Sequence, residues 1–306
     1  MVLYNPHSDP LSNAVSHITT GSERAGGAYG FRLLGQQHGL DALPRAPASW
    51  PVVTLRWEAG RIPEGGREIE VDEREARVRV PGVAGVLLDR DASSATLVSP
   101  EPLGDDRFLH PMLGYIASVF SHWLGRLVLH GGAFAAGDEG VALLGGRGAG
   151  KSSTLAWLAR EGAAVVADDV LVLDGLSVFA GPRSIDLWPE TARHLGFSEH
   201  TDTVRGGHRQ RLEMRPAANE LQLRAWVSLA WGPRTALRPL RPQERYSKLV
   251  EQLHVHEPGR LPGPEKLLEL LALPALELTR PKQLDSLPGA GAALLELTRR
   301  LARESS

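Results

Sequence analysis

Nine consecutive residues carry the clearest chemistry in this sequence: Gly145, Gly146, Arg147, Gly148, Ala149, Gly150, Lys151, Ser152 and Ser153. Four of them, Gly145, Gly150, Lys151 and Ser152, fit the pattern G-x-x-x-x-G-K-[ST], in which glycines let backbone N–H groups turn toward a phosphate. The lysine would reach the terminal phosphates, and the serine hydroxyl would bind Mg²⁺ at the start of a helix whose dipole favours anions. We therefore predict that all nine residues bind nucleotide phosphates; a chance glycine-rich turn is the alternative.

Two aspartates and one histidine could complete a phosphoryl-transfer site. Asp168 and Asp169 follow the small apolar run AAVVA, and His130 ends the run LVL. Phosphoryl transfer needs a carboxylate for the metal and a group that accepts the proton of the attacking hydroxyl, so adjacent aspartates can divide the two tasks. From the residues, either aspartate can take either task. The alternatives are a solvated turn for the aspartates and a structural role for His130.

A cluster of cationic side chains lies in RGGHRQRLEMR, residues 205–215. Guanidinium groups could neutralise charge on the transferring phosphate, and we favour Arg209 and Arg211, which lie deepest in this run. A solvated basic loop is the alternative, and Arg183 is a weaker candidate. For the remaining residues of interest, we expect Trp188, Trp226 and Trp231 to pack in the core and His254 and His256 to lie on the surface.

The candidate residues lie where the sequence alternates between strand and helix. From residue 127 there are three apolar strand segments, LVLHGGAFAAG, GVALLGG and AAVVADDVLVLDG, with the helical segment KSSTLAWLAREG between the last two. This order is typical of a βαβ phosphate-binding unit. Further strands (RAWVSLAW, PALELTR) then alternate with helices (QERYSKLVEQL, PEKLLELLA, GAALLELTRRLA), with linkers near 257–264 and 281–289.

The N-terminal part of the sequence has a different pattern. Residues 1–28 are polar and predicted to be a flexible leader, and residues 29–126 are predicted to form a β-rich, antiparallel lobe. A helix over 110–126, with apolar residues recurring every 3.6 positions, would end this lobe and join it to the core of residues 127–306.

Composition excludes several classes of protein. The formal net charge of −2 predicts no long-range attraction to nucleic acid or anionic membrane, and the absence of cysteine excludes disulfides and thiolate chemistry. The start MVLYNPHSDP does not resemble a signal peptide, and no apolar stretch has the roughly 20 residues that span a bilayer. We expect a cytoplasmic protein.

Taken together, His130-Gly131, the loop that starts 15 positions later, and Ala167-Asp168-Asp169 resemble the catalytic core of HPr kinase/phosphorylase and its HPr-kinase-like relatives. The resemblance covers about residues 130–170. It implies an α/β core with a mixed sheet, related to phosphoenolpyruvate carboxykinases, that transfers phosphate from ATP to a serine hydroxyl. It further implies Asp168 as the base, His130 as its orienting neighbour, Asp169 and Ser152 as magnesium ligands, and a homo-oligomer.

The sequence also departs from that family. Ser153 stands where members that phosphorylate HPr have a glutamate, and GPRSIDLWPETARHLG replaces the E-x-R-G-x-G stretch tied to phosphorolysis. The first 110 residues do not resemble the family's regulatory domain. These departures point to the relatives found in biosynthetic gene clusters, whose acceptor is a precursor peptide or another small molecule.

We therefore predict an ATP- and Mg²⁺-dependent kinase that acts on a serine-type hydroxyl of a peptide or small protein. A small-molecule hydroxyl kinase with the same residues is the first alternative, and a nucleotide-binding regulatory protein without phosphate transfer is the second. The sequence has no LSGGQ-like stretch of a transport ATPase and no N/T-K-x-D guanine motif of a GTPase.

Overall fold

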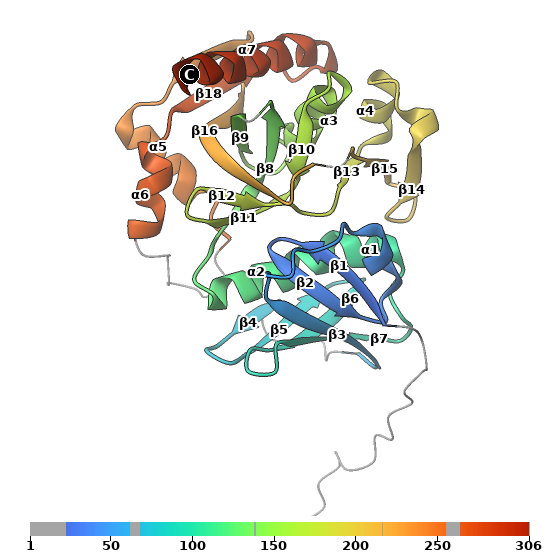
Figure 1. Cartoon of the computed structure of the whole chain (residues 1–306). Helices are drawn as coiled ribbons and strands as arrows, with labels where there is room; N and C mark the ends of the chain where they lie inside the picture. The colour runs from blue at the N-terminus through green and yellow to red at the C-terminus, as the bar shows by residue number, and fades with distance from the viewer. Residues whose placement is uncertain (1–22, 62–67, 138, 216, 255–263, 306) are drawn as a thin grey trace, which may run out of the picture.

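The computed structural model describes residues 23–61, 68–137, 139–215, 217–254 and 264–305. It is a mixed α/β structure in which an N-terminal lobe packs beneath a larger core, as Figure 1 shows. None of the helices in the described part of the chain is long and apolar enough to cross a membrane.

The lobe is built on a single sheet of the order β1-β2-β3-β7-β6-β5-β4. Its strands are β1 (Arg24–Ala28), β2 (Phe31–Gly35), β3 (Val52–Ala59), β4 (Ile69–Val71), β5 (Glu75–Val80), β6 (Ala84–Asp89) and β7 (Ser94–Ser99), and the turn η1 (His38–Ala42) lies between β2 and β3. Two expectations need correction. The sheet is mixed, because β3 is parallel to both β2 and β7. Residues 24–28 of the predicted leader form β1, which pairs with β2; residues 1–22 lie outside the described residues.

One helical segment joins the lobe to the core. It consists of α1 (Asp105–Arg107), η2 (Phe108–Met112) and α2 (Leu113–Trp123). The helix expected over 110–126 is present as α2 but is shorter, because the backbone of His110 is extended and interrupts the segment before Leu113. The apolar residues that defined the period are buried: Met112, Leu113, Ile116, Val119, Phe120 and Trp123. They share one hydrophobic cluster with Val170, Val172 and Phe179 of the core, so the lobe and the core are packed through a continuous apolar interior.

The core sheet has the order β10-β8-β11-β12-β16-β18-β17, and β9 lies between β8 and β16. Its strands are β8 (Leu127–Ala136), β9 (Glu139–Leu144), β10 (Ala164–Ala167), β11 (Val170–Asp174), β12 (Ser177–Phe179), β16 (Glu220–Trp231), β17 (Ala236–Pro239) and β18 (Ala275–Arg280). Both β9 and β10 are antiparallel to β8, so they are parallel to each other, and α3 (Lys151–Arg160) connects them. The predicted βαβ unit is therefore present, with β8 between its two strands.

The remaining elements surround this sheet. A small sheet of β13 (Ser184–Leu187), β15 (Arg209–Glu213) and β14 (Thr201–Val204) lies beside α3, together with α4 (Pro189–His194) and η3 (Ser198–His200). The other helices are α5 (Pro242–Val250), α6 (Pro264–Ala272), η4 (Leu284–Ser286) and α7 (Leu287–Ser305). The linker predicted near 281–289 is shorter than expected, because α7 starts at Leu287. Most of the linker predicted near 257–264 lies outside the described residues.

Helix α7 packs against α3, and Gly291 of α7 lies directly against Trp157 of α3. A methyl group at Gly291 would collide with the indole of Trp157 in α3, whereas one at Gly289 in the same helix would have its nearest neighbour at 3.6 Å. We expect Gly291→Ala to lower the free energy of unfolding by about 1–3 kcal/mol, the usual cost of overpacking. Gly289→Ala, the control, should leave it unchanged or slightly higher. Urea unfolding measures both, and equal values for the two variants would contradict this packing.

Candidate active site: a glycine loop facing two aspartates

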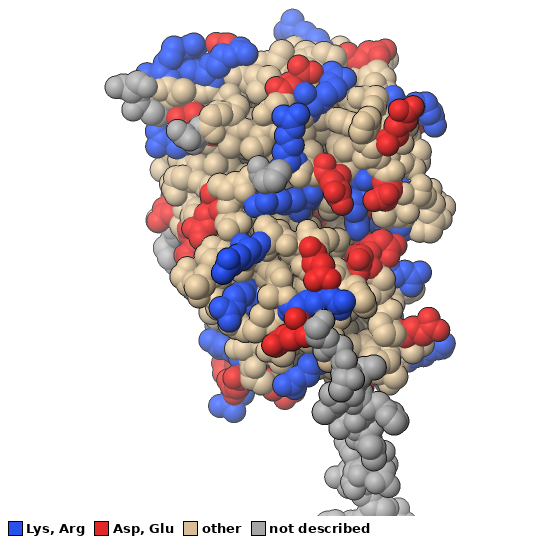
Figure 2. Space-filling model, turned by 45° about the vertical axis from the view of Figure 1, so that its right-hand side comes forward, with Lys and Arg blue, Asp and Glu red and all other residues tan. Residues whose placement is uncertain are grey.

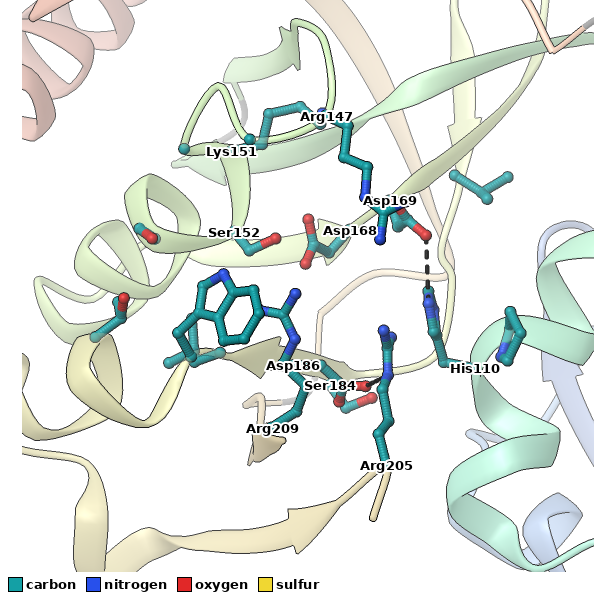
Figure 3. Close-up of a pocket in the computed structure, with 18 of the residues that line it drawn as sticks. His110, Arg147, Lys151, Ser152, Asp168, Asp169, Ser184, Asp186, Arg205 and Arg209 are labelled. Carbon is teal, nitrogen blue, oxygen red and sulfur yellow. Dashed lines mark hydrogen bonds and ion pairs between the residues drawn. The ribbon is translucent and has the colours of Figure 1, made fainter. Parts of the chain in front are cut away.

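A cavity of about 1050 Å³ lies at the boundary between lobe and core. The loop after β9 and the aspartates after β10 form one wall, the residues around η2 form a second, and the small sheet of β13–β15 forms a third. Figure 3 shows these walls facing one another. The cavity therefore lies outside the carboxyl ends of the two parallel strands of the βαβ unit, which is the usual position of ligands in open α/β sheets.

The glycine loop has the backbone shape that the motif predicts. Gly148 and Gly150 have φ angles of 83° and 90°, a conformation that side-chain-bearing residues rarely adopt. The loop is closed by a hydrogen bond from the Ala149 N–H to the Gly146 carbonyl at 3.1 Å, and α3 starts at Lys151. Successive N–H groups of such a turn, followed by a helix N-terminus, form an anion-binding concavity.

Lys151 lies at the inner edge of this concavity and is buried. Its Nζ donates to the Gly145 carbonyl at 2.7 Å and contacts His130 Nε2 at 2.9 Å. Burial lowers the pKa of Lys151, while the charges of Asp168 and Asp169 oppose that shift. The structure thus brings the predicted lysine, histidine and aspartates into one group.

The contact with Lys151 fixes the state of His130. Because an ammonium can only donate, His130 Nε2 accepts, and the ring proton is on Nδ1, which lies 3.0 Å from the carbonyl oxygen of Asp169. Burial is the main cause that lowers the pKa of His130, and the charge of Lys151 adds to it. His130 is therefore a neutral link between the lysine and the second aspartate.

Asp168 is half-buried beside Ser152 at the cavity wall, and their side chains face each other in Figure 3. Its Oδ1 has no hydrogen-bond partner in the described structure. Burial, followed by the charge of Asp169, raises the pKa of Asp168 to about 6. An unpartnered buried carboxylate oxygen costs free energy, so it fits a site that receives a cation.

The donor set is compatible with magnesium held jointly by protein and phosphates. Among the described residues, no group of three or more His, Cys, Asp and Glu side chains is arranged to hold a metal ion. Mg²⁺ in nucleotide sites is commonly held by only one or two protein ligands, with phosphates and water supplying the rest. Ser152 and the two aspartates line the cavity and supply oxygen atoms of this kind.

Asp169 has a different environment. Its backbone adopts a φ of 71°, unusual for a residue with a side chain, and its side chain lines the cavity and is 43% exposed. The Oδ1 atom lies 3.4 Å from His130 Nδ1, and the Oδ2 atom lies 3.5 Å from His110 Nε2. Both aspartates line the cavity, but Oδ1 of Asp168 is buried, whereas the exposed side chain of Asp169 is open to an incoming molecule and is oriented by two imidazoles.

His110 comes from the lobe, and the sequence analysis missed it. It belongs to η2, 20 positions before His130. In this segment the spacing of the apolar residues predicted a helix, and no functional role was predicted for the histidine. Burial is the main cause that lowers the pKa of His110 to about 4, so the ring is uncharged at neutral pH. Its contact with Asp169 is drawn in Figure 3.

The predicted arginines separate into two environments. Arg209 faces the cavity, with its guanidinium carbon 3.5 Å from the centre of the Trp188 ring. Arg211 is buried and donates to Asp186 from Nε at 2.7 Å and Nη2 at 3.0 Å, and it does not line the cavity. Arg211 thus holds a neighbouring carboxylate, whereas Arg205, which also pairs with Asp186 at 2.8 Å, does line the cavity.

Further expectations concerned three tryptophans, two histidines and Arg183. Trp226 is buried as expected, but Trp188 and Trp231 are 53% and 37% exposed, because both stand where a strand ends at the cavity. His254 is not a free surface residue: it lines the cavity with its ring centre 6.1 Å from that of His130. His256 lies outside the described residues. Arg183 binds the Ala217 carbonyl at 2.6 Å, away from the cavity wall.

The face of the molecule drawn in Figure 2 carries charges of both signs. Figure 2 shows blue Lys and Arg side chains alternating with red Asp and Glu side chains over both core and lobe, so this face carries no continuous basic surface.

The pKa of Asp168 leads to a prediction about stability. Because its folded value of about 6 exceeds the ordinary 3.8, the folded chain binds more protons than the unfolded chain between about pH 4 and pH 6, and the free energy of unfolding falls as the pH rises through that window. Asp168→Asn removes this penalty. Without nucleotide, the free energy of unfolding of the variant should exceed that of the wild type by roughly 1–3 kcal/mol at pH 8, and the two free energies should become equal near pH 4.

Thermal unfolding at both pH values measures this effect. Asp202→Asn, which changes an exposed aspartate of β14, is the control and should show no pH-dependent difference from the wild type. If the stability of Asp168→Asn differed from that of the wild type by the same amount at pH 4 and pH 8, the raised pKa of Asp168 would be contradicted.

Comparisons with known proteins give only distant likenesses, all of them to solved structures. No family model matches the sequence, and no curated protein matches it. Among solved structures, that of the Hpr(Ser) kinase/phosphatase from Coxiella burnetii aligns with 58% of this chain and 97% of its own, at 14% sequence identity and a TM-score of 0.30. A likeness this distant assigns neither a family nor an activity to the chain.

Proposed function

We propose that this protein is an ATP-dependent kinase that transfers the γ-phosphate to a serine-type hydroxyl of a peptide or small protein. The observation that carries the proposal is that three features meet in one cavity. They are Lys151 at an anion-binding loop, an aspartate with a buried, unpartnered oxygen beside Ser152, and a second, more open aspartate oriented by two histidines. A site that only bound nucleotide would have no use for the last of these features.

The division of labour between the aspartates follows from their environments. Asp168 lies beside Ser152, and its buried Oδ1 lacks a partner, so these two residues would hold Mg²⁺. When bound, the ion would neutralise charge on the β- and γ-phosphates. Asp169 is the accessible carboxylate, so it would accept the proton of the acceptor hydroxyl. This reverses the assignment that the family resemblance implied, in which Asp168 was the base and Asp169 the metal ligand.

In the proposed reaction, the acceptor oxygen forms a bond to the γ-phosphorus while the bond from that phosphorus to the β,γ-bridging oxygen breaks. ADP leaves with the bridging oxygen, and the hydroxyl proton passes to Asp169 Oδ1 or Oδ2. Lys151 and the loop N–H groups bind the phosphates, and Arg209, held against Trp188, faces the same space as a cation for the transferring group.

The acceptor would enter between lobe and core. The wall opposite the loop is formed by Arg107, Leu109, His110 and Tyr115 of the lobe and by Arg205 of the small sheet. A wall that combines apolar and cationic side chains suits a peptide segment with an acidic residue near its serine. Since acceptor choice depends on such loops, a small hydroxylated molecule is the competing acceptor.

Measuring ADP release tests this proposal. The protein is incubated with ATP and Mg²⁺, first alone and then with a panel of serine-containing peptides or hydroxylated metabolites. A kinase releases ADP in proportion to the acceptor that it phosphorylates. ADP release that no acceptor stimulates would indicate hydrolysis, and tight ATP binding without turnover would favour a regulatory protein; either result contradicts the proposal.

A further inference from the structure

The glycine loop divides the cavity into two flanks. The loop follows β9, and the aspartates follow β10 on one side of it. On the other side lie β16, which is parallel to β9, and β18, which is parallel to β16. The carboxyl ends of all three strands therefore reach the same edge of the sheet. Those ends carry Trp231 and Arg280, and both residues line the cavity.

Arg280 is a buried, immobilised cation. Its Nη1 donates to Ser286 Oγ at 2.9 Å, to the Gln283 carbonyl at 3.2 Å and to the Pro281 carbonyl at 3.3 Å, and its side chain is almost completely covered. The guanidinium carbon lies 4.5 Å from the centre of the Trp231 ring. A cation at this distance from the ring is attracted to it, so Arg280 holds the indole in place.

Trp231 is at the same time exposed and adjacent to the loop. The residue is 37% exposed, although it is large, apolar and fixed on one side by Arg280. A methyl group at Gly150 would come within 3.1 Å of Trp231 Cη2 and 2.5 Å of Arg280 Nη2, so the pair packs directly against the last glycine of the loop. A flat aromatic surface is therefore available beside the phosphate site.

We infer that Trp231 is the surface on which the nucleobase of the bound nucleoside triphosphate stacks. The inference rests on the proposed function, because it takes the terminal phosphate to face the aspartates. A triphosphate held in the loop with that orientation continues toward the opposite flank, where β16 and β18 end. Every nucleobase has a π-face, so the indole provides affinity for the nucleoside without choosing between purines.

Trp188 is the second indole that lines this cavity, and its position argues for another task. It follows β13, which packs against α3, and it is stacked against Arg209, whose guanidinium lies within electrostatic reach of Asp168 and Asp186. Trp188 therefore lies on the flank of the transferring phosphate and the acceptor.

Comparing two anions tests the inference. ATP and inorganic tripolyphosphate, each with Mg²⁺, are titrated by calorimetry into the wild type and into Trp231→Ala, Trp231→Phe and Trp57→Ala. Trp57, in β3 of the lobe, is 38% exposed and does not line the cavity, so it is a matched control. Trp231→Ala should weaken ATP binding by about 5- to 100-fold and change the affinity for tripolyphosphate by no more than about two-fold. Trp231→Phe should retain most of the ATP affinity.

Each other outcome has a distinct meaning. If Trp231→Ala lost affinity for ATP and for tripolyphosphate equally, the inference would be overturned, because the ring would then only support Gly150. Unchanged binding of both anions would overturn it as well, and an ATP-selective loss in Trp188→Ala but not in Trp231→Ala would place the base on the other flank. If the wild type bound neither anion, the proposed function itself would fail.

Discussion

Replacing Asp169 by Asn is expected to slow phosphate transfer by about 100- to 10,000-fold, the usual contribution of a general base, while ATP affinity changes by no more than about two-fold. The amide keeps the shape of the side chain and its contact distance to His110 Nε2, but it cannot take up the hydroxyl proton. Single-turnover transfer from radiolabelled ATP gives the chemical rate, and calorimetry gives the affinity.

Asp168→Asn is the matched variant for this prediction, because it makes the same chemical change one residue earlier in the chain. It should weaken Mg²⁺-dependent ATP binding and leave binding measured without Mg²⁺ nearly unchanged, because Asp168 would hold the ion with Ser152. The opposite pattern, with intact Mg²⁺-dependent binding in Asp168→Asn and lost binding in Asp169→Asn, would restore the assignment implied by the family resemblance.

Replacing Lys151 by Ala is expected to weaken binding of both ATP and tripolyphosphate by about 30- to 100-fold, because charge-assisted hydrogen bonds to phosphate are lost. The change should also raise the pKa of His130, since the charge of Lys151 contributes to its lowering after burial. Calorimetry measures the affinities, and NMR titration of the imidazole resonances measures the pKa.

Lys266→Ala is the control for this prediction, because Lys266 is an exposed lysine of α6 and does not line the cavity. It should bind both anions like the wild type. An unchanged affinity of Lys151→Ala for tripolyphosphate would contradict the assignment of the loop as the phosphate site.

The sequence was most informative where neighbours along the chain decide the structure. The loop, α3 and the strand before the two aspartates depend on local turn chemistry and on apolar runs, and all three are present. The course of the chain in the lobe was harder to predict. Whether β3 pairs in parallel or antiparallel fashion depends on connections between distant strands, which a short-range pattern does not contain.

The site itself was predictable only in part, for the same physical reason. Arg209 and Arg211 lie two positions apart and therefore on the same face of β15, but Arg211 stands opposite Asp186 of β13 and pairs with it, whereas Arg209, at the start of the strand, stacks on Trp188 at the cavity. His110 reaches Asp169 only because the lobe packs on the core. The exposure of Trp188 and Trp231 likewise results from strands that end at a cavity wall formed by several separate segments.

The most direct test of the proposed function is the intact mass of a serine-containing peptide acceptor after incubation with the protein, ATP and Mg²⁺. The account predicts a gain of about 80 Da on a serine hydroxyl with the wild type, and a strongly reduced yield with Asp169→Asn under conditions where that variant still binds ATP. A wild-type yield from Asp169→Asn, or ATP binding by the wild type with no mass gain on any acceptor of the panel, would contradict it.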